Sequence, residues 1–173
     1  VDDVAWEVGH FLHLALHGNP TILETFVAPI EEATFDGKEL RELFPLVISR
    51  KRVYDAFRGY ASSQRKKMFE PTGGVLAGER VWKFAVAYLR VLYHGAFLLE
   101  SGQWHTQIEN SDFLHLLRSI RGGNETLGAV VDEAAHLESN ITRAYLGSAV
   151  QEEPQTEVVN YWLLGLRSRH WRR

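Results

Sequence analysis

Residues 79–100 form the segment that most constrains how this chain can fold. Apolar side chains recur along it at helical spacing, and further apolar side chains occupy most of its other faces. A helix that is apolar nearly all round has to be covered by other elements of the protein. The sequence therefore predicts a long central helix that is buried within a bundle.

The rest of the chain consists of shorter amphipathic segments separated by turn signals. Helical spacing predicts further helices over residues 4–17, 21–28, 38–44, 50–69, 111–121, 125–145 and 157–170. No run of residues alternates convincingly between apolar and polar. We therefore predict an all-α fold, a bundle of about six to eight helices, as one domain over residues 1–173. Flexible connections are expected near residues 70–78 and 150–156.

Local signals predict where several helices begin and end. Asp2 or Asp3 is expected to cap the first helix. Ser49 is expected to cap the helix over residues 50–69. Thr21 and Glu24 have the spacing of a capping box. Ser111 or Asp112 is expected to cap the helix over 111–121. A turn at 36–37, a break at Pro45 and a short extended piece over 103–107 complete these expectations.

Composition excludes several classes of protein. The chain has no cysteine, which excludes a disulfide framework, a thiolate zinc site and a cysteine nucleophile. No apolar run approaches the roughly 20 residues that a membrane-spanning helix needs. The N-terminus has no signal-peptide pattern. We therefore expect a cytoplasmic protein with no membrane partner.

The net charge of −3 hides a basic segment. Residues 49–67 contain one acid, Asp55, and seven cations. A basic segment on an acidic body can bind polyanions such as nucleic acid, and it can equally be a solvated helix face. The cations are Arg50, Lys51, Arg52, Arg58, Arg65, Lys66 and Lys67.

A polar stripe interrupts the apolar central helix. Lys83, Arg90 and His94 follow one another at helical spacing along one side of it. Cations on a largely buried helix need anionic partners, because an unpaired buried charge is costly. Two interpretations remain open at this point. In the first, carboxylates such as Glu24 or Glu138 neutralise the stripe, or the stripe is simply exposed on the surface. In the second, the stripe contacts a phosphate.

Histidines suggest two further types of site. His13 and His17 have the i, i+4 spacing of metal ligands, but no carboxylate is placed as a third ligand, so we predict a polar surface there that includes His10. Arg90 with His94 resembles the Arg–His pairs of helical ribonuclease toxins. The pair formed by residues 167 and 170 resembles them too, although both spacings are shorter than in those families.

Five segments of the chain match a known pattern in order. They are EVGHFLHLALHGNPTILE (7–24), RGYASSQ (58–64), WKFAVAYLRVLYHGAFLLESG (82–102), LLRSIRGG (116–123) and VVNYWLLGLRSRHW (158–171). These segments resemble predicted nucleotidyltransferases of the DNA polymerase beta superfamily, which are common in bacteria and phages and sometimes associated with RNA repair. The match runs over nearly the whole chain, and its most specific element is GNPTILE at residues 18–24.

The resemblance implies a catalytic apparatus that these 173 residues do not contain. Such proteins carry Gly-Ser and Asp-x-Asp motifs on a small mixed sheet, and the carboxylates hold two Mg²⁺ ions. No Asp-x-Asp occurs here, and Gly147-Ser148 is not followed by one. We therefore expect a helical part that is inactive alone, with Mg²⁺ needed only beside the catalytic sheet and no cofactor of its own. Asp3 is the one candidate for a catalytic or metal-binding carboxylate.

The resemblance also implies roles for residues of the helical part. We expect it to position a nucleoside triphosphate, an RNA or DNA acceptor, or both. Lys83 and Arg90 are expected to contact phosphate, and Asn19, Tyr60 and Gln64 to shape the pocket. The residues expected to steer nucleic acid are Arg50, Lys51, Arg58, Arg65 and Lys66.

Two alternatives stand beside this interpretation. One is a non-catalytic helical module that binds nucleic acid or a partner protein. The other is a helical ribonuclease that uses Arg90 and His94. The sequence assigns no oligomeric state.

Overall fold

The fold is all-α, as predicted. A computed structural model describes residues 4–70 and 78–171, and every regular element within these ranges is a helix. No helix in these ranges is long and apolar enough to cross a membrane. The nine helices of the described ranges are α1 (Val8–Leu16), α2 (Pro20–Val27), α3 (Phe35–Glu42), α4 (Phe44–Val47), α5 (Arg50–Phe69), α6 (Gly78–Ser101), α7 (Ser111–Arg121), α8 (Leu127–Gly147) and α9 (Thr156–His170).

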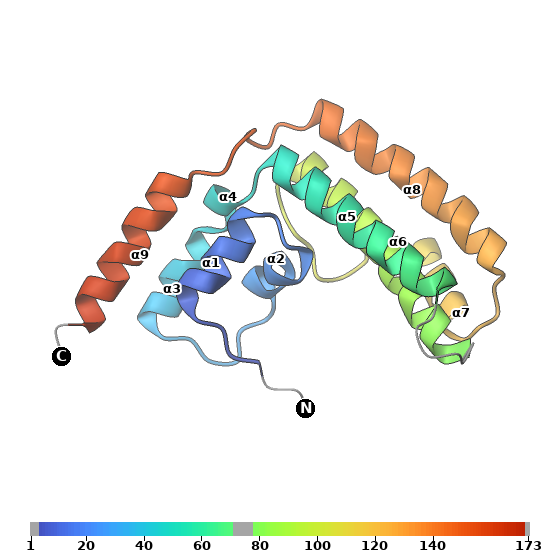
Figure 1. Ribbon diagram of the computed structural model, residues 1–173, viewed down its shortest axis with the longest axis horizontal. Helices are drawn as coiled ribbons and strands as arrows, with labels where there is room; N and C mark the ends of the chain where they lie inside the picture. The colour runs from blue at the N-terminus through green and yellow to red at the C-terminus, as the bar shows by residue number, and fades with distance from the viewer. Residues whose placement is uncertain (1–3, 71–77, 172–173) are drawn as a thin grey trace.

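Helix α6 is the centre of the bundle, which confirms the expectation for residues 79–100. Helices α5, α7 and α8 all pack on it (Figure 1). The closest approach is at Gly95, where an added Cβ would lie 2.7 Å from Ile141 Cδ1 of α8 and 2.8 Å from Phe57 Cδ1 of α5. Only a residue without a side chain lets three helices meet so closely.

The four N-terminal helices form a cluster at one end of α5, and α9 lies along it (Figure 1). Gly18 ends α1 with φ of 72°, and its Cα faces the backbone carbonyl of Arg52 in the first turn of α5. An added Cβ there would lie 2.7 Å from that oxygen. Gly18 therefore fixes how the cluster meets the bundle.

The connection before α9, where the sequence predicts a flexible linker over 150–156, is tied to the N-terminal cluster by hydrogen bonds. The Gln151 side-chain amide donates to the carbonyls of Pro45, Leu46 and Ile48. The backbone N–H of Gln155 donates to Leu46 at 2.8 Å. The other expected connection falls largely on residues 71–77, which lie outside the described residues.

Two cap predictions at the N-terminus are wrong. Helix α1 begins at Val8 and is capped by Glu7, whose carboxylate accepts from the His10 N–H at 2.8 Å. Residues 4–7 are therefore not helical, and residues 1–3 lie outside the described residues. Helix α2 is capped by Asn19 with Pro20 in its first turn. Pro lacks the N–H that a helix start leaves unpaired, so α2 begins one residue before the predicted capping box.

Other boundaries differ for similar local reasons. Residues 36–37 lie in the first turn of α3, and Pro45 lies in the first turn of α4, where its fixed φ suits a helix start. Asn110, not Ser111 or Asp112, caps α7. Ser49 caps α5 as predicted. Residues 103–107 contain no strand.

Candidate functional site

Arg90 of α6 lies between two hollows of the surface. The larger is the α6–α7 groove, with a volume of about 500 Å³. The smaller is the α2–α6 cavity, with a volume of about 90 Å³. Arg90 lines both hollows, and it therefore lies where the two hollows meet.

The α6–α7 groove combines an apolar wall with a concentration of positive charge. Its apolar side chains are Val86 of α6, Ile108 of the α6–α7 connection, and Leu114 and Leu117 of α7. Among the residues that the structure describes, no carboxylate lines it. Its cations are Arg90, Arg118 and Arg121.

Arg118 and Arg121 lie on one side of α7, near its end. They lie three residues apart in the last turn, so both project from the same side of the helix. Helix α7 packs on α6, and this contact brings them to the groove that Arg90 lines. Guanidinium groups bind phosphate oxygens with paired N–H donors. The groove therefore suits a ligand with an apolar, flat body and several negative charges.

The α2–α6 cavity holds the partner of Arg90. The Arg90 guanidinium lies 3.3 Å from the Glu24 carboxylate of α2, in a half-exposed ion pair. This confirms that Glu24 neutralises part of the stripe on α6. Glu138, the other carboxylate considered, instead accepts a hydrogen bond from the Tyr88 hydroxyl at 2.8 Å. Burial and this carboxylate both raise the pKa of Tyr88.

His94 is buried at the inner end of this cavity. Its side chain is 5% exposed, and its ring stacks on Trp104 with centroids 5.2 Å apart. Burial, with a smaller contribution from the charge of Arg90, lowers the pKa of His94 to about 4. The imidazole is therefore neutral at pH 7 and has no access to a phosphodiester. This geometry gives no support to a ribonuclease that uses Arg90 and His94.

The other Arg–His pair is also engaged in ion pairs. Arg167 Nη2 lies 3.3 Å from the Glu7 carboxylate, and His170 Nε2 lies 2.8 Å from the Asp36 carboxylate. These contacts hold α9 against α1 and α3.

The other residues expected in the pocket are only partly brought together. Tyr60 of α5 lines the α2–α6 cavity with Glu24 and Arg90. Asn19 lies just before α2, and its side-chain oxygen accepts from the N–H groups of residues 21 and 22. Gln64 is buried on α5 and lines neither hollow. Lys83 is exposed on α6, seven residues before Arg90. Asp3 lies outside the described residues.

The five residues of α5 that are expected to steer nucleic acid divide into two groups. Arg50 lies 2.9 Å from the Glu152 carboxylate, and Lys66 lies 3.8 Å from that of Glu70. These two cations are already neutralised in part.

Lys51, Arg58 and Arg65 form the second group. They are exposed and share one side of α5 at seven-residue spacing. Arg58 lies over the Tyr54 ring at 5.0 Å, and Arg65 lies over the Phe69 ring at 5.7 Å. These contacts hold the guanidinium groups in place without neutralising their charge.

The described residues offer no ligand set for the Mg²⁺ that the resemblance implies. Nowhere within residues 4–70 and 78–171 do three or more His, Asp or Glu side chains gather closely enough to hold a metal ion. His10, His13 and His17 are exposed, as predicted, and His17 Nδ1 donates to the His13 carbonyl at 2.7 Å. Nothing in these residues therefore places a metal ion at the groove.

Residues 1–153 match the model of a family described as the RNA repair pathway DNA polymerase beta family, RlaP. The chain belongs to this family. No curated protein and no solved structure matches the chain. The match shows that the resemblance to polymerase-beta-type nucleotidyltransferases is real.

Within this RlaP chain, every residue that lines the α6–α7 groove lies in the matched segment. The sequence singled out Arg90 as a candidate phosphate contact but not Arg118 and Arg121, which line the same groove. The available signal was the LLRSIRGG segment, in which two arginines lie three residues apart at a helix end. Helix α9 lies beyond the matched segment.

Proposed function

We propose that this chain is the helical, substrate-binding part of a polymerase-beta-type nucleotidyltransferase, and that its α6–α7 groove positions a nucleoside triphosphate. The observation that carries the proposal is the convergence of Arg90, Arg118 and Arg121 on one apolar-walled groove, with no carboxylate among its described lining residues. The volume of about 500 Å³ lies within the range of roughly 300–1,000 Å³ that is usual for small-ligand sites.

The proposed binding mode follows from the two kinds of wall. The base and sugar pack on Leu114, Leu117 and Val86, where apolar contact excludes water. The phosphates face Arg118 and Arg121, with Arg90 at the end of the groove nearest α2. Lys83 is exposed on the same helix as Arg90 and adds positive potential to the approach.

Transfer itself requires a cluster of carboxylates, and the described residues do not form one. Mg²⁺ held by a catalytic sheet would activate the attacking hydroxyl and stabilise the leaving pyrophosphate. The role of the chain is then to bind and orient the nucleotide. Orientation alone contributes substantially to the rate of a reaction between two bound groups.

A nucleic-acid acceptor has its own surface in this proposal. Lys51, Arg58 and Arg65 present three cations on one side of α5. Residues seven apart on a helix lie about 10 Å apart along its axis, so the three cations follow an extended polyanion rather than one phosphate.

The test is nucleotide affinity, measured by fluorescence polarisation with a labelled nucleoside triphosphate. The double substitution of Arg118 and Arg121 by Ala is expected to weaken binding by about tenfold or more, since charge-assisted hydrogen bonds are lost. Arg143→Ala is the matched control, because Arg143 is exposed on α8 and lines neither hollow. Unchanged affinity in the folded double variant would overturn the groove assignment, as would equal binding of the nucleoside without phosphates.

A second candidate function is favoured by the basic side of α5. A non-catalytic module would bind RNA through Lys51, Arg58 and Arg65 alone. It predicts RNA binding that weakens steeply with salt and shows no dependence on triphosphate. Reciprocal dependence of RNA and triphosphate binding would favour the transferase instead.

A further inference from the structure

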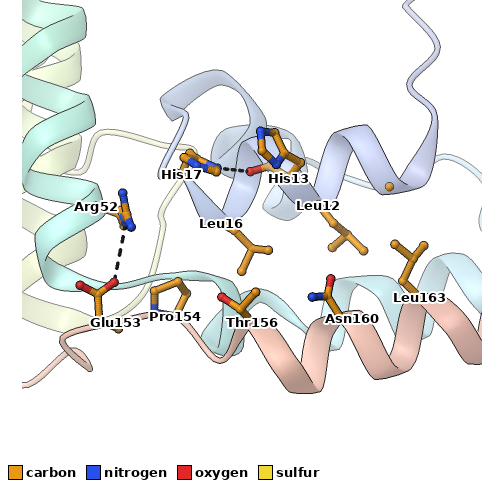
Figure 2. Close-up of a pocket in the computed structure, with 11 residues that line it drawn as sticks. Leu12, His13, Leu16, His17, Arg52, Glu153, Pro154, Thr156, Asn160 and Leu163 are labelled. Carbon is orange, nitrogen blue, oxygen red and sulfur yellow. Dashed lines mark hydrogen bonds and ion pairs between the residues drawn. The ribbon is translucent and has the colours of Figure 1, made fainter.

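A second cavity lies between α1 and α9, away from the groove. This α1–α9 cavity has a volume of about 390 Å³. Figure 2 shows Leu12 and Leu16 pointing from α1 toward α9, while Thr156, Asn160 and Leu163 point from α9 toward α1. None of its lining residues lines the α6–α7 groove.

The α9 wall of this cavity lies outside the segment that the family model matches. Thr156, Asn160 and Leu163 follow residue 153, where the match ends. Membership of the family therefore does not assign the cavity a role, and its chemistry has to be inferred from the side chains that line it.

The walls offer two complementary kinds of contact. Leu12, Leu16 and Leu163 give an apolar interior. Asn160 and Thr156 add a side-chain amide, which both donates and accepts, and a hydroxyl. A ligand that fills this space has an apolar face and an edge that carries hydrogen-bond donors and acceptors.

Residues with planar side chains line the end of the cavity nearest α5. They are His13, His17 and Arg52, and the rings of the two histidines lie against each other with centroids 4.4 Å apart. Unstacked bases of single-stranded nucleic acid are commonly bound by stacking on imidazole rings and guanidinium planes, with hydrogen bonds to the base edges. The α1–α9 cavity contains both kinds of group.

The charges around the cavity favour a neutral ligand. Arg52 Nε lies 3.7 Å from the Glu153 carboxylate, and both side chains line the cavity. A phosphate placed there would face this carboxylate, whereas a neutral base would not be repelled. This distinguishes the cavity from the α6–α7 groove, whose lining has no carboxylate in the part of the chain that the structure describes.

We propose that the α1–α9 cavity binds one unstacked base of a single-stranded nucleic acid. The phosphates of that strand would lie outside the cavity. Arg52, which lines the cavity, and Lys51, from which the exposed basic side of α5 continues through Arg58 and Arg65, both lie in the first turn of that helix. A base in the cavity would therefore lie near the end of α5 at which this cationic surface begins. The proposal concerns the acceptor strand and does not depend on nucleotide binding in the groove.

The test compares ligands of equal charge that differ only in their bases. Fluorescence polarisation with the 173-residue chain would use ten-nucleotide RNAs of A or of U and a fully abasic ribose-phosphate of the same length. We expect at least one base-containing RNA to bind about tenfold more tightly than the abasic strand. Equal binding of all three, or no binding, would overturn the proposal without bearing on triphosphate binding.

A substitution of Asn160 tests whether the base binds in the α1–α9 cavity. Asn160→Leu removes the amide but keeps much of the volume, so we expect it to lower RNA affinity about tenfold and leave abasic-strand affinity unchanged. Ser168→Ala is the control, because Ser168 is exposed on the same helix and does not line the cavity. Circular dichroism would confirm that both variants fold. RNA affinity of Asn160→Leu equal to that of Ser168→Ala would overturn the assignment.

Two further ligands identify the source of the base. DNA of the same sequence is expected to bind in the same Asn160-dependent way if only the base enters the cavity. Free nucleoside monophosphate is expected to bind at least tenfold more weakly than the RNA, because it lacks the neighbouring phosphates. A monophosphate that binds as tightly as the strand would show that the ligand is a free nucleotide, which would overturn the proposal.

Discussion

The Glu24 carboxylate of α2 lies 3.3 Å from the Arg90 guanidinium of α6, where the α2–α6 cavity meets the α6–α7 groove. One ion pair therefore joins the segment that contains GNPTILE to the central helix. It also competes with any anion that Arg90 could bind in the groove.

Removing this competition should strengthen triphosphate binding. Half-exposed ion pairs contribute little to stability, so Glu24→Gln is expected to fold normally and to raise triphosphate affinity by about two- to fivefold. Fluorescence polarisation measures the change, and Glu42→Gln, an exposed carboxylate of α3, serves as the control. A loss of affinity in Glu24→Gln would instead mean that Glu24 holds Arg90 in its binding position.

The contact of α5, α6 and α8 at Gly95 predicts opposite effects of two similar substitutions. Gly95→Ala is expected to destabilise the fold by about 1–3 kcal/mol, because its Cβ would overlap side chains of Phe57 and Ile141. Gly59→Ala is expected to stabilise it by about 0.5–1 kcal/mol, because Gly59 is exposed within α5 with no atom near its added Cβ. Urea unfolding measures both. Equal effects of the two substitutions would contradict the three-helix contact.

The cap of α2 should matter for stability and for the site. Asn19 accepts two backbone N–H bonds at the start of α2, and Thr126 accepts one at the start of α8, so either change to Ala should cost about 1 kcal/mol of unfolding free energy. Only Asn19→Ala should also alter triphosphate affinity, because α2 carries Glu24, whereas the residues that line the two hollows include none from α8. Thermal unfolding and polarisation separate the two effects. Equal affinities of the two variants would contradict the link between the α2 cap and the site.

Burial of His94 predicts a pH dependence of stability. The pKa of His94 is about 4, below its ordinary value of 6.5. Between pH 4 and pH 6.5, His94 therefore carries a proton in the unfolded chain but not in the folded protein. Stability that is present above about pH 6.5 should be lost progressively down to about pH 4, by up to about 3 kcal/mol.

Urea unfolding at pH 7 and pH 5 measures this loss. His94→Phe should remove most of the difference between the two pH values, whereas His136→Gln, on the exposed side of α8, should retain it. An unchanged pH dependence in His94→Phe would show that other groups cause the loss.

Local patterns accounted for the elements of the fold but less well for their ends. Apolar spacing predicted α5 and α6 closely, since burying a stripe of side chains dominates the stability of a long helix. The caps of α1, α2 and α7 were assigned to the wrong residues, because Asp, Asn, Ser and Thr near a helix start have similar capping energies. The stripe on α6 indicated that Arg90 needs an anionic partner, with Glu24 and Glu138 as two of the possibilities, and the structure pairs it with Glu24.

The sequence by itself determined an all-α bundle around a buried α6, the family, and Arg90 as a residue that needs an anionic partner. Only the tertiary structure placed Arg118 and Arg121 in the same groove as Arg90, buried Gln64 and His94, and joined α1 to α9 around a cavity. The physical reason is the range of the interactions. Helix formation depends on residues within a few turns, whereas a site depends on how helices far apart in the sequence pack together.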